Sequence, residues 1–210
     1  MGLANWWDAH IVPRIIRCAC GLPMIAELRG EVVPLAKGRV FELGCGGGLN
    51  QPFYNAAQIT AFSGLDPSAK LLDFAREEAR AKGWEADIRA GFGEDLPFDD
   101  ASFDTVVSTF TLCSVSDHAK VLSELRRVLK PGGTMLYVEH GSAPDAGVSR
   151  WQRRIEPVWK HLTGNCHLTR KVSSAIAESG FAVSQIGGRF VKGTPRPMGW
   201  IEWGWATKAA

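Results

Sequence analysis

The 210-residue sequence has little charge imbalance and no long apolar run. Its 24 basic and 22 acidic residues are interspersed, without the basic block that a nucleic-acid-binding surface needs. No apolar stretch approaches the roughly 18 residues of a membrane-spanning helix, and the first residues do not resemble a secretory signal. We therefore expect a cytoplasmic protein whose partner is a small molecule and not a nucleic acid.

Paired cysteine motifs are also missing. The number of cysteines is odd, and none of them has the C-x-x-C spacing of zinc sites and redox motifs: Cys18, Cys20, Cys45, Cys113 and Cys166. The sequence therefore predicts neither a disulfide framework nor a metal site. Cys166 is interpreted as a packing or pocket-lining residue.

What the chain does contain is a regular alternation of strand and helix signals. Short apolar runs predict strands at 39–43, 60–65, 86–90, 103–108 and 134–139. Helices are expected from about Asn50, from Asp66-Pro67-Ser68 to Gly83, and from an N-cap at Ser116 to the turn at 130–133. A helical segment at 145–170, a helix at 172–179 and strands at 181–190 and 199–207 complete the pattern. It predicts a doubly wound, mostly parallel, Rossmann-like α/β sheet with a C-terminal antiparallel hairpin, which binds ligands at the carboxyl ends of its strands.

A glycine-rich turn follows the first predicted strand and has the pattern acidic-x-G-x-G-x-G, from Glu42 to Gly48. A dinucleotide site of the form G-x-G-x-x-G would need its third glycine at position 49, which is Leu49 here. The spacing instead favours a loop that curves around the amino acid and ribose of S-adenosylmethionine; a tight turn without a ligand is the alternative. Asp66 ends the second strand, where its carboxylate can accept hydrogen bonds from both ribose hydroxyls, cap the next helix, or do both.

Together these residues resemble the successive motifs of class I methyltransferases. The matching stretches are Val40-Phe41-Glu42-Leu43-Gly44, Gly64-Leu65-Asp66-Pro67-Ser68, Glu94-Asp95-Leu96-Pro97-Phe98, Ser102-Phe103-Asp104 and Arg127-Val128-Leu129-Lys130-Pro131. The resemblance implies S-adenosyl-L-methionine as cofactor and S-adenosyl-L-homocysteine as product. It also implies adenine recognition by the Gly93 amide, with Phe92 or Pro67 against the ring. The full set of cofactor-binding residues expected from it is Glu42, Gly44, Cys45, Gly46, Gly48, Asn50, Asp66, Pro67, Gly93, Glu94 and Thr109.

A narrower likeness extends into the flanking segments. Leu112-Cys113-Ser114-Val115, Glu139-His140, Trp151-Gln152 and Leu168-Thr169-Arg170 are similar to the alkyl-thiol methyltransferases of the methyltransferase-like group. This likeness implies methyl transfer to a small apolar acceptor, with a thiol favoured. A phospholipid or quinone acceptor is the alternative, and a non-catalytic regulator that only binds the cofactor is the alternative from a different class.

Three histidines are the candidates for acid–base catalysis. His140 ends the fifth strand at the ligand-binding edge, where it can orient or deprotonate an acceptor or serve as a structural histidine. His161 and His167 lie in the inserted segment that we expect above the pocket, which can equally be a surface loop. Phe110 is either an aromatic neighbour of the sulfonium or a core residue. Methyl transfer needs positioning above all, so a weak base or none would suffice.

The expected organisation is a single domain over residues 1–210. An N-terminal helical cover (1–38) precedes the cofactor-binding core (39–139), the inserted substrate-side segment (140–170), and the last helix with its closing hairpin (171–210). Apolar residues from Trp7 to Leu22 recur at helical spacing near two arginines. They predict either an amphipathic cover that makes peripheral membrane contact or a helix packed on the sheet.

Overall fold

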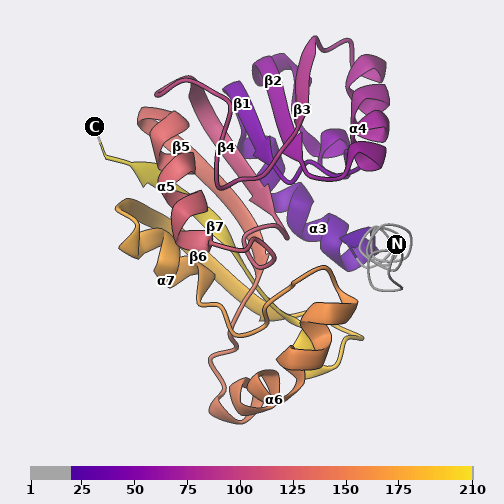
Figure 1. The fold of residues 1–210 in the computed structure, drawn as a ribbon, viewed down its shortest axis with the longest axis vertical. Coiled ribbons are helices and arrows are strands. Elements are labelled where there is room, and N and C mark those ends of the chain that lie inside the picture. Colours follow the sequence, from indigo (N-terminus) through magenta and orange to yellow (C-terminus); the bar gives the residue numbers. More distant parts are fainter. Residues whose placement is uncertain (1–19, 210) are drawn as a thin grey trace.

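The computed structural model describes residues 20–209, and within them seven strands form one sheet in the order β3-β2-β1-β4-β5-β7-β6 (Figure 1). The strands are β1 (Gly38–Leu43), β2 (Ile59–Asp66), β3 (Ala86–Ala90), β4 (Phe103–Thr109), β5 (Leu129–His140), β6 (Phe181–Phe190) and β7 (Trp200–Lys208). The first five pair in parallel, whereas β7 pairs antiparallel with both β5 and β6. The predicted fold class is confirmed.

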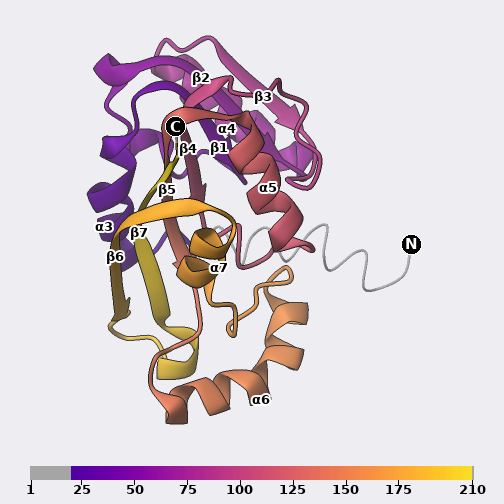
Figure 2. The same cartoon turned by 90° about the vertical axis from the view of Figure 1, so that its left-hand side faces the viewer.

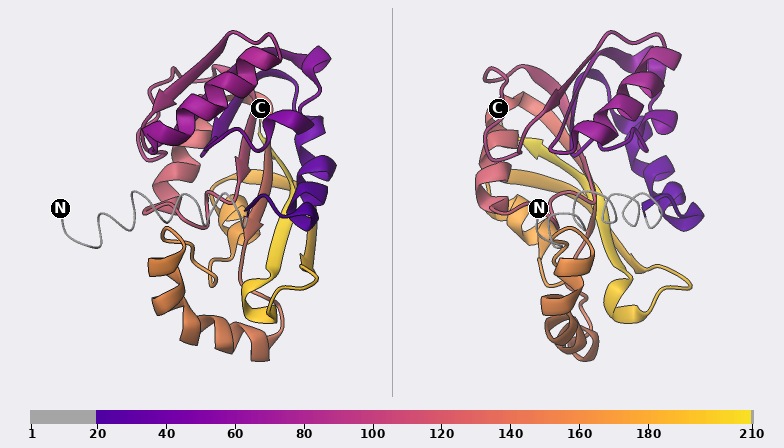
Figure 3. Two further views of the ribbon diagram at one scale, coloured as in Figure 1. Left: turned by 90° about the vertical axis from the view of Figure 1, so that its right-hand side faces the viewer. Right: turned by 45° about the vertical axis from the view of Figure 1, so that its right-hand side comes forward.

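Helices cover both faces of this sheet. Helices α3 (Pro23–Val32) and α4 (Ala69–Ala81) pack on one face, and α5 (His118–Val128) and α7 (Val172–Glu178) pack on the other. Figure 2 shows the strands between α3 and α5. Helix α6 (Ala146–Leu162) lies beyond the strand ends and buries only Gln152 fully (Figure 3). Within the described part of the chain, no helix is both long and apolar enough to cross a membrane.

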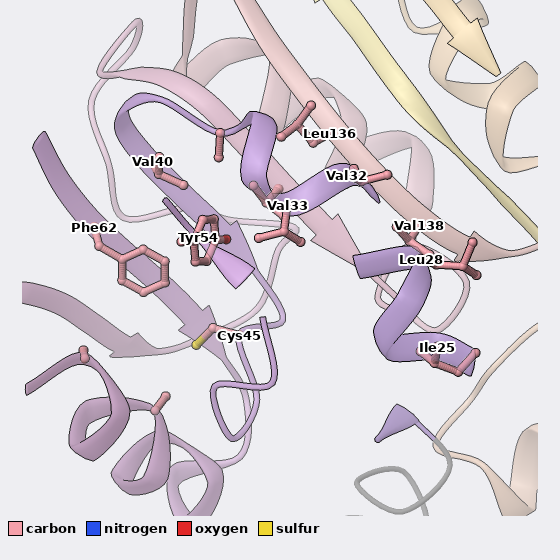
Figure 4. Packing of buried hydrophobic residues seen from close by; sticks show 14 of the residues in the cluster. Ile25, Leu28, Val32, Val33, Val40, Cys45, Tyr54, Phe62, Leu136 and Val138 are labelled. Carbon is pink, nitrogen blue, oxygen red and sulfur yellow. The ribbon is translucent and has the colours of Figure 1, made fainter. Parts of the chain in front are cut away.

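The two faces arise from the alternation of side chains along each buried strand. In β5, Leu136 and Val138 join the cluster under α3 and α4, while Met135 and Tyr137 join the cluster under α5 and α7. Figure 4 shows the first cluster, in which Tyr54 lies between Phe62 and Val33. Both clusters are fully buried, so the sheet is a rigid platform for the loops at its edge.

Local signals explain most helix boundaries. Leu72, Ala75 and Ala79 place one face of α4 on the sheet, and the chain leaves this helix at Gly83, whose φ of +73° suits glycine. Helix α5 begins after Asp117, whose carboxylate accepts a hydrogen bond from the Lys120 amide at 3.0 Å. The predicted N-cap, Ser116, was therefore one residue early; its amide donates to Glu94 instead.

Two other predicted elements differ. The helix predicted from Asn50 is only a short 3-10 helix, Gln51–Phe53. It ends there because Tyr54 adopts an extended backbone conformation and its side chain is buried in the core. The strand predicted at 134–139 is the second part of a longer β5. Leu129 already pairs with Phe103, and the turn at 130–133 is an irregularity within the strand. The N-terminal spacing from Trp7 to Cys18 lies outside the described residues, and the expected helical cover and membrane contact stay predictions.

Candidate active site

A cavity of about 550 Å³ opens at the carboxyl ends of the strands, where the strand order reverses between β1 and β4. Open α/β sheets bind ligands at this position. Ten of the eleven predicted cofactor-binding residues line it: Glu42, Gly44, Cys45, Gly46, Asn50, Asp66, Pro67, Gly93, Glu94 and Thr109. A second cavity of about 540 Å³, between α5 and α7, contains none of the predicted residues.

The glycine loop forms one wall of the cavity in a backbone conformation that other residues rarely adopt. Gly44 and Gly46 have φ values of +65° and +48°. A Cβ on Gly44 would lie 2.1 Å from the Thr111 hydroxyl oxygen, whereas one on Gly46 would find only open space and distant atoms. Gly48 is not among the lining residues; a Cβ there would lie 3.3 Å from the Ala75 Cα on α4. Gly44 and Gly46 therefore shape the cavity, and Gly48 allows the loop to pack on α4.

Asp66 lies at the end of β2 with both carboxylate oxygens engaged by backbone amides. Oδ2 accepts from Gly46 at 3.0 Å and Oδ1 accepts from Ser68 at 2.8 Å. Burial raises the pKa of Asp66 above its ordinary value, and these two hydrogen bonds partly offset the rise. The side chain thus joins the glycine loop to the start of α4 and presents a fixed acceptor to the cavity, so that its two predicted roles are compatible.

A buried polar network lies below the glycine loop. Asn50 donates through Nδ2 to Glu42 Oε1 and to Thr109 Oγ1, both at 2.9 Å, and Tyr54 donates to Glu42 Oε2 at 2.8 Å. Burial raises the pKa of Glu42 to about 7, although the hydrogen bonds from Tyr54 and Asn50 and the charge of Arg29 lower it. Glu42 therefore changes charge near neutral pH, at the wall of the cavity.

Arg29 of α3 completes the network, and the sequence interpretation missed it. Its Nε donates to Asn50 Oδ1 at 2.8 Å, and its guanidinium lies 5.4 Å from the centre of the Phe110 ring. Only 3% of the residue is exposed, and it lines the cavity. One signal in the sequence could have revealed it: a charge among the buried positions of α3, between Leu28 and Val32.

The loop after β4 is held by the buried carboxylate of Glu139. Oε1 accepts hydrogen bonds from the Ser108 hydroxyl and from the amides of Thr111 and Leu112, and Oε2 accepts from the Cys113 amide. Burial raises the pKa of Glu139, and the amide donors oppose that rise. Four donors on one buried side chain hold the loop rigidly at the cavity wall.

The three predicted catalytic histidines occupy different environments. Among the described residues that line the cavity there is no histidine. His140 is directly behind the wall, with its ring centre 5.2 Å from that of Phe110 and Nδ1 3.5 Å from Cys166 Sγ. His167 pairs with Glu156 at 3.2 Å, and His161 is exposed on α6, so the structure does not bring His161 above the pocket. Catalytic roles for His140 and His167 stay predictions.

Comparisons with known proteins agree with this geometry. A family model described as a methyltransferase domain matches residues 41–137. Thiol S-methyltransferase TMT1B of Rattus norvegicus is 38% identical over 168 residues, which cover 79% of this chain and 66% of the rat protein. TMT1B of Homo sapiens is 35% identical over 187 residues, covering 86% of this chain and 73% of the human protein.

The chain belongs to the class I, S-adenosylmethionine-dependent methyltransferases. A solved methyltransferase of this cofactor class, from Mesorhizobium loti, has the same fold, with a TM-score of 0.64 over 90% of this chain and 99% of that one at 20% identity. The matched region spans about two thirds of the rat relative's length.

The residues of the cavity fit S-adenosylmethionine. Gly44 and Gly46 form the cavity wall with bare backbone at positive φ, Asp66 offers a fixed acceptor for ribose hydroxyls, and Glu42 offers a negative charge for the cofactor's ammonium group. Phe92, 69% exposed at the cavity rim, is free to pack against the adenine. When bound, the cofactor supplies a methyl group on a positively charged sulfur.

Cofactor affinity should fall by about tenfold between pH 8 and pH 6. The ammonium group of the ligand favours the charged form of Glu42. Because the pKa of Glu42 is near 7, most of the protein carries a neutral Glu42 at pH 6 and must lose that proton before it binds. Calorimetric titrations with S-adenosylhomocysteine at several pH values measure the effect. A Glu42→Gln variant should bind more weakly at pH 8 and lose most of this pH dependence. An equally steep profile in the variant would exclude Glu42 as its source.

Proposed function

We propose that this methyltransferase transfers the methyl group to the sulfur of small, apolar thiols. The observation that supports the proposal most strongly is the likeness to two relatives named thiol S-methyltransferase, over 79% and 86% of this chain. The cavity wall supports it as well, since it includes Phe110, Ser114 and Val115, and no lysine is among the described residues that line it.

In this reaction a lone pair on the thiol sulfur forms a bond to the methyl carbon while the bond from that carbon to the cofactor's sulfur breaks. The products are a thioether and S-adenosylhomocysteine, and the thiol proton leaves to solvent or to a nearby base. A thiol is more acidic than an alcohol and its sulfur is strongly nucleophilic, so catalysis depends mainly on alignment. The rigid loop held by Glu139 and the fixed Asp66 carboxylate are the parts of this chain that align the reactants.

An S-adenosylhomocysteine-release assay across acceptor classes tests the proposal. We expect alkyl thiols to be turned over at least about tenfold faster than quinols, phosphatidylethanolamine vesicles or primary amines at the same concentration. The Asp66→Ala variant, assayed in parallel, identifies background release. Turnover of quinols or of phosphatidylethanolamine, with none of any thiol, would assign the enzyme to the alternative acceptor class.

A further inference from the structure

Three metal-binding side chains from distant segments meet behind the cavity wall. Cys113 belongs to the loop after β4, His140 ends β5, and Cys166 follows α6. One donor atom from each lies within 4.8 Å of the other two. The Sγ atoms of Cys113 and Cys166 are 3.7 Å apart, and Cys166 Sγ lies 3.5 Å from His140 Nδ1. This arrangement could not be read from the spacing of the cysteines, because the chain assembles it through the fold.

The distances match a tetrahedral metal site. Zinc–sulfur bonds of about 2.3 Å and zinc–nitrogen bonds of about 2.0–2.1 Å at tetrahedral angles place two sulfurs about 3.8 Å apart and a sulfur and a nitrogen about 3.5 Å apart. Both contacts of Cys166 agree with these separations to within about 0.1 Å. The donor atoms of Cys113 and His140 lie within 4.8 Å of each other and must approach to about 3.5 Å when an ion binds.

Backbone hydrogen bonds hold the segments of the two cysteines in place, and the Cys113 Sγ also lies 3.5 Å from the Ser114 Oγ. The Cys113 amide donates to Glu139, and the Cys113 carbonyl accepts from the His167 amide at 2.8 Å. The Asn165 side chain donates to the Ser114 carbonyl at 2.8 Å, which ties the two cysteine segments together. Both cysteines are free and at most 5% exposed. Hydrogen bonds that fix the segments around potential ligands are a common feature of metal sites, where they orient the ligands for the ion.

The site adjoins the acceptor side of the cavity. Ser114 and Asn165, the chain neighbours of the two cysteines, line the cavity, and Phe110 separates it from the His140 ring. Among residues 20–209, no fourth histidine, cysteine or carboxylate joins the group. Catalytic zinc sites have three protein ligands and a fourth, non-protein ligand, whereas structural sites have four protein ligands. The three side chains are themselves not among the described residues that line the cavity and lie directly behind its wall.

We propose that Cys113, His140 and Cys166 bind one borderline-soft divalent ion, such as Zn²⁺, whose fourth ligand is the acceptor thiol. Binding to the ion removes the thiol proton to solvent and leaves the sulfur lone pair available for attack on the methyl carbon. The identity of the fourth ligand rests on the proposed function; the metal site itself does not.

The metal content of the purified full chain tests the site. After loading with zinc under reducing conditions and desalting, the wild type should retain about one equivalent, and Cys166→Ala and His140→Ala less than about a tenth. His118→Ala on α5 is the matched control, because it removes a histidine outside both the group and the cofactor cavity and should retain the metal. S-Adenosylhomocysteine binding, measured by calorimetry, identifies any variant that has not folded. A wild type that retains no zinc, or contains a Cys113–Cys166 disulfide in its place, overturns the proposal.

Cobalt substitution tests the fourth ligand. The Co²⁺ protein should show a sulfur-to-metal band and a tetrahedral visible spectrum that shifts on addition of butanethiol but not of butanol. An unchanged spectrum overturns the thiol ligand. Full thiol turnover by metal-free enzyme overturns the acceptor thiol as the fourth ligand while the proposed function stands, whereas a loaded enzyme that methylates quinols and no thiol refutes the proposed function and leaves the metal site intact.

Discussion

Replacing Gly44 with alanine is expected to weaken cofactor binding by at least about 100-fold and to lower the melting temperature. An alanine at φ +65° costs about 1–2 kcal/mol, and a Cβ at 2.1 Å from the Thr111 hydroxyl adds an overpacking penalty of about 1–3 kcal/mol. The loop can relieve the contact only by moving away from Thr111, which distorts the wall that faces the cofactor. Calorimetry with S-adenosylhomocysteine and thermal unfolding measure the two effects.

Two further variants separate the causes of this loss. Gly30→Ala, within α3, is the control: its Cβ would meet only Phe53 at 3.8 Å, and alanine is favoured over glycine inside a helix. We expect it to bind normally and to melt slightly higher. Adding Thr111→Ala to Gly44→Ala removes the two closest contacts and should restore part of the affinity. No recovery in the double variant would mean that the backbone conformation alone causes the defect.

Replacing Asp66 with alanine is expected to weaken cofactor binding by about 100-fold. A hydrogen bond to a charged group contributes about 1.5–3 kcal/mol, so loss of two ribose contacts removes roughly 3 kcal/mol, and each 1.4 kcal/mol corresponds to a factor of ten. The change also leaves the Gly46 and Ser68 amides without their acceptor, which loosens the glycine loop. Asp66→Asn keeps one good acceptor and should lose about tenfold.

The matched control for Asp66 is Asp73→Ala on the neighbouring helix. The Asp73 side chain is 75% exposed and pairs with Arg76 at 3.0 Å, a surface ion pair of small energetic value. Its removal should leave affinity within about twofold of the wild type. If Asp66→Ala bound as tightly as this control, Asp66 could not be the ribose ligand.

Much of the cofactor site was predictable because its signals are local. A glycine turn after a buried strand and an acidic residue at the end of the next strand are read from adjacent positions, and parallel strands bring their carboxyl ends to one edge. For this reason Glu42, Gly44, Gly46 and Asp66 were placed together correctly at the cavity. Gly48 lies against α4 and is not among the residues that line the cavity, because the spacing of glycines does not show which one faces a ligand and which one faces a helix; its role in cofactor binding stays a prediction.

The acceptor side was predicted less well because its residues meet only through long-range packing. Arg29 precedes the first strand by nine positions and reaches Asn50 only because α3 packs against β5 and β7. His161 and His167 lie five residues from Cys166 at most, yet one is exposed and the other pairs with Glu156. The sequence alone does not show where a histidine side chain points, because that depends on how its segment packs in the fold.

Strand periodicity was enough to predict the sheet and its parallel core, since it depends on neighbours within a few residues, and the resemblance to class I methyltransferases implied the cofactor. The convergence of Cys113, His140 and Cys166 was decided by the tertiary structure alone. Residues separated by more than 20 positions meet only when the sheet orders their strands, and no local pattern in the chain encodes that meeting. The identity of the acceptor therefore has to be tested at these three side chains, because the sequence motifs do not specify it.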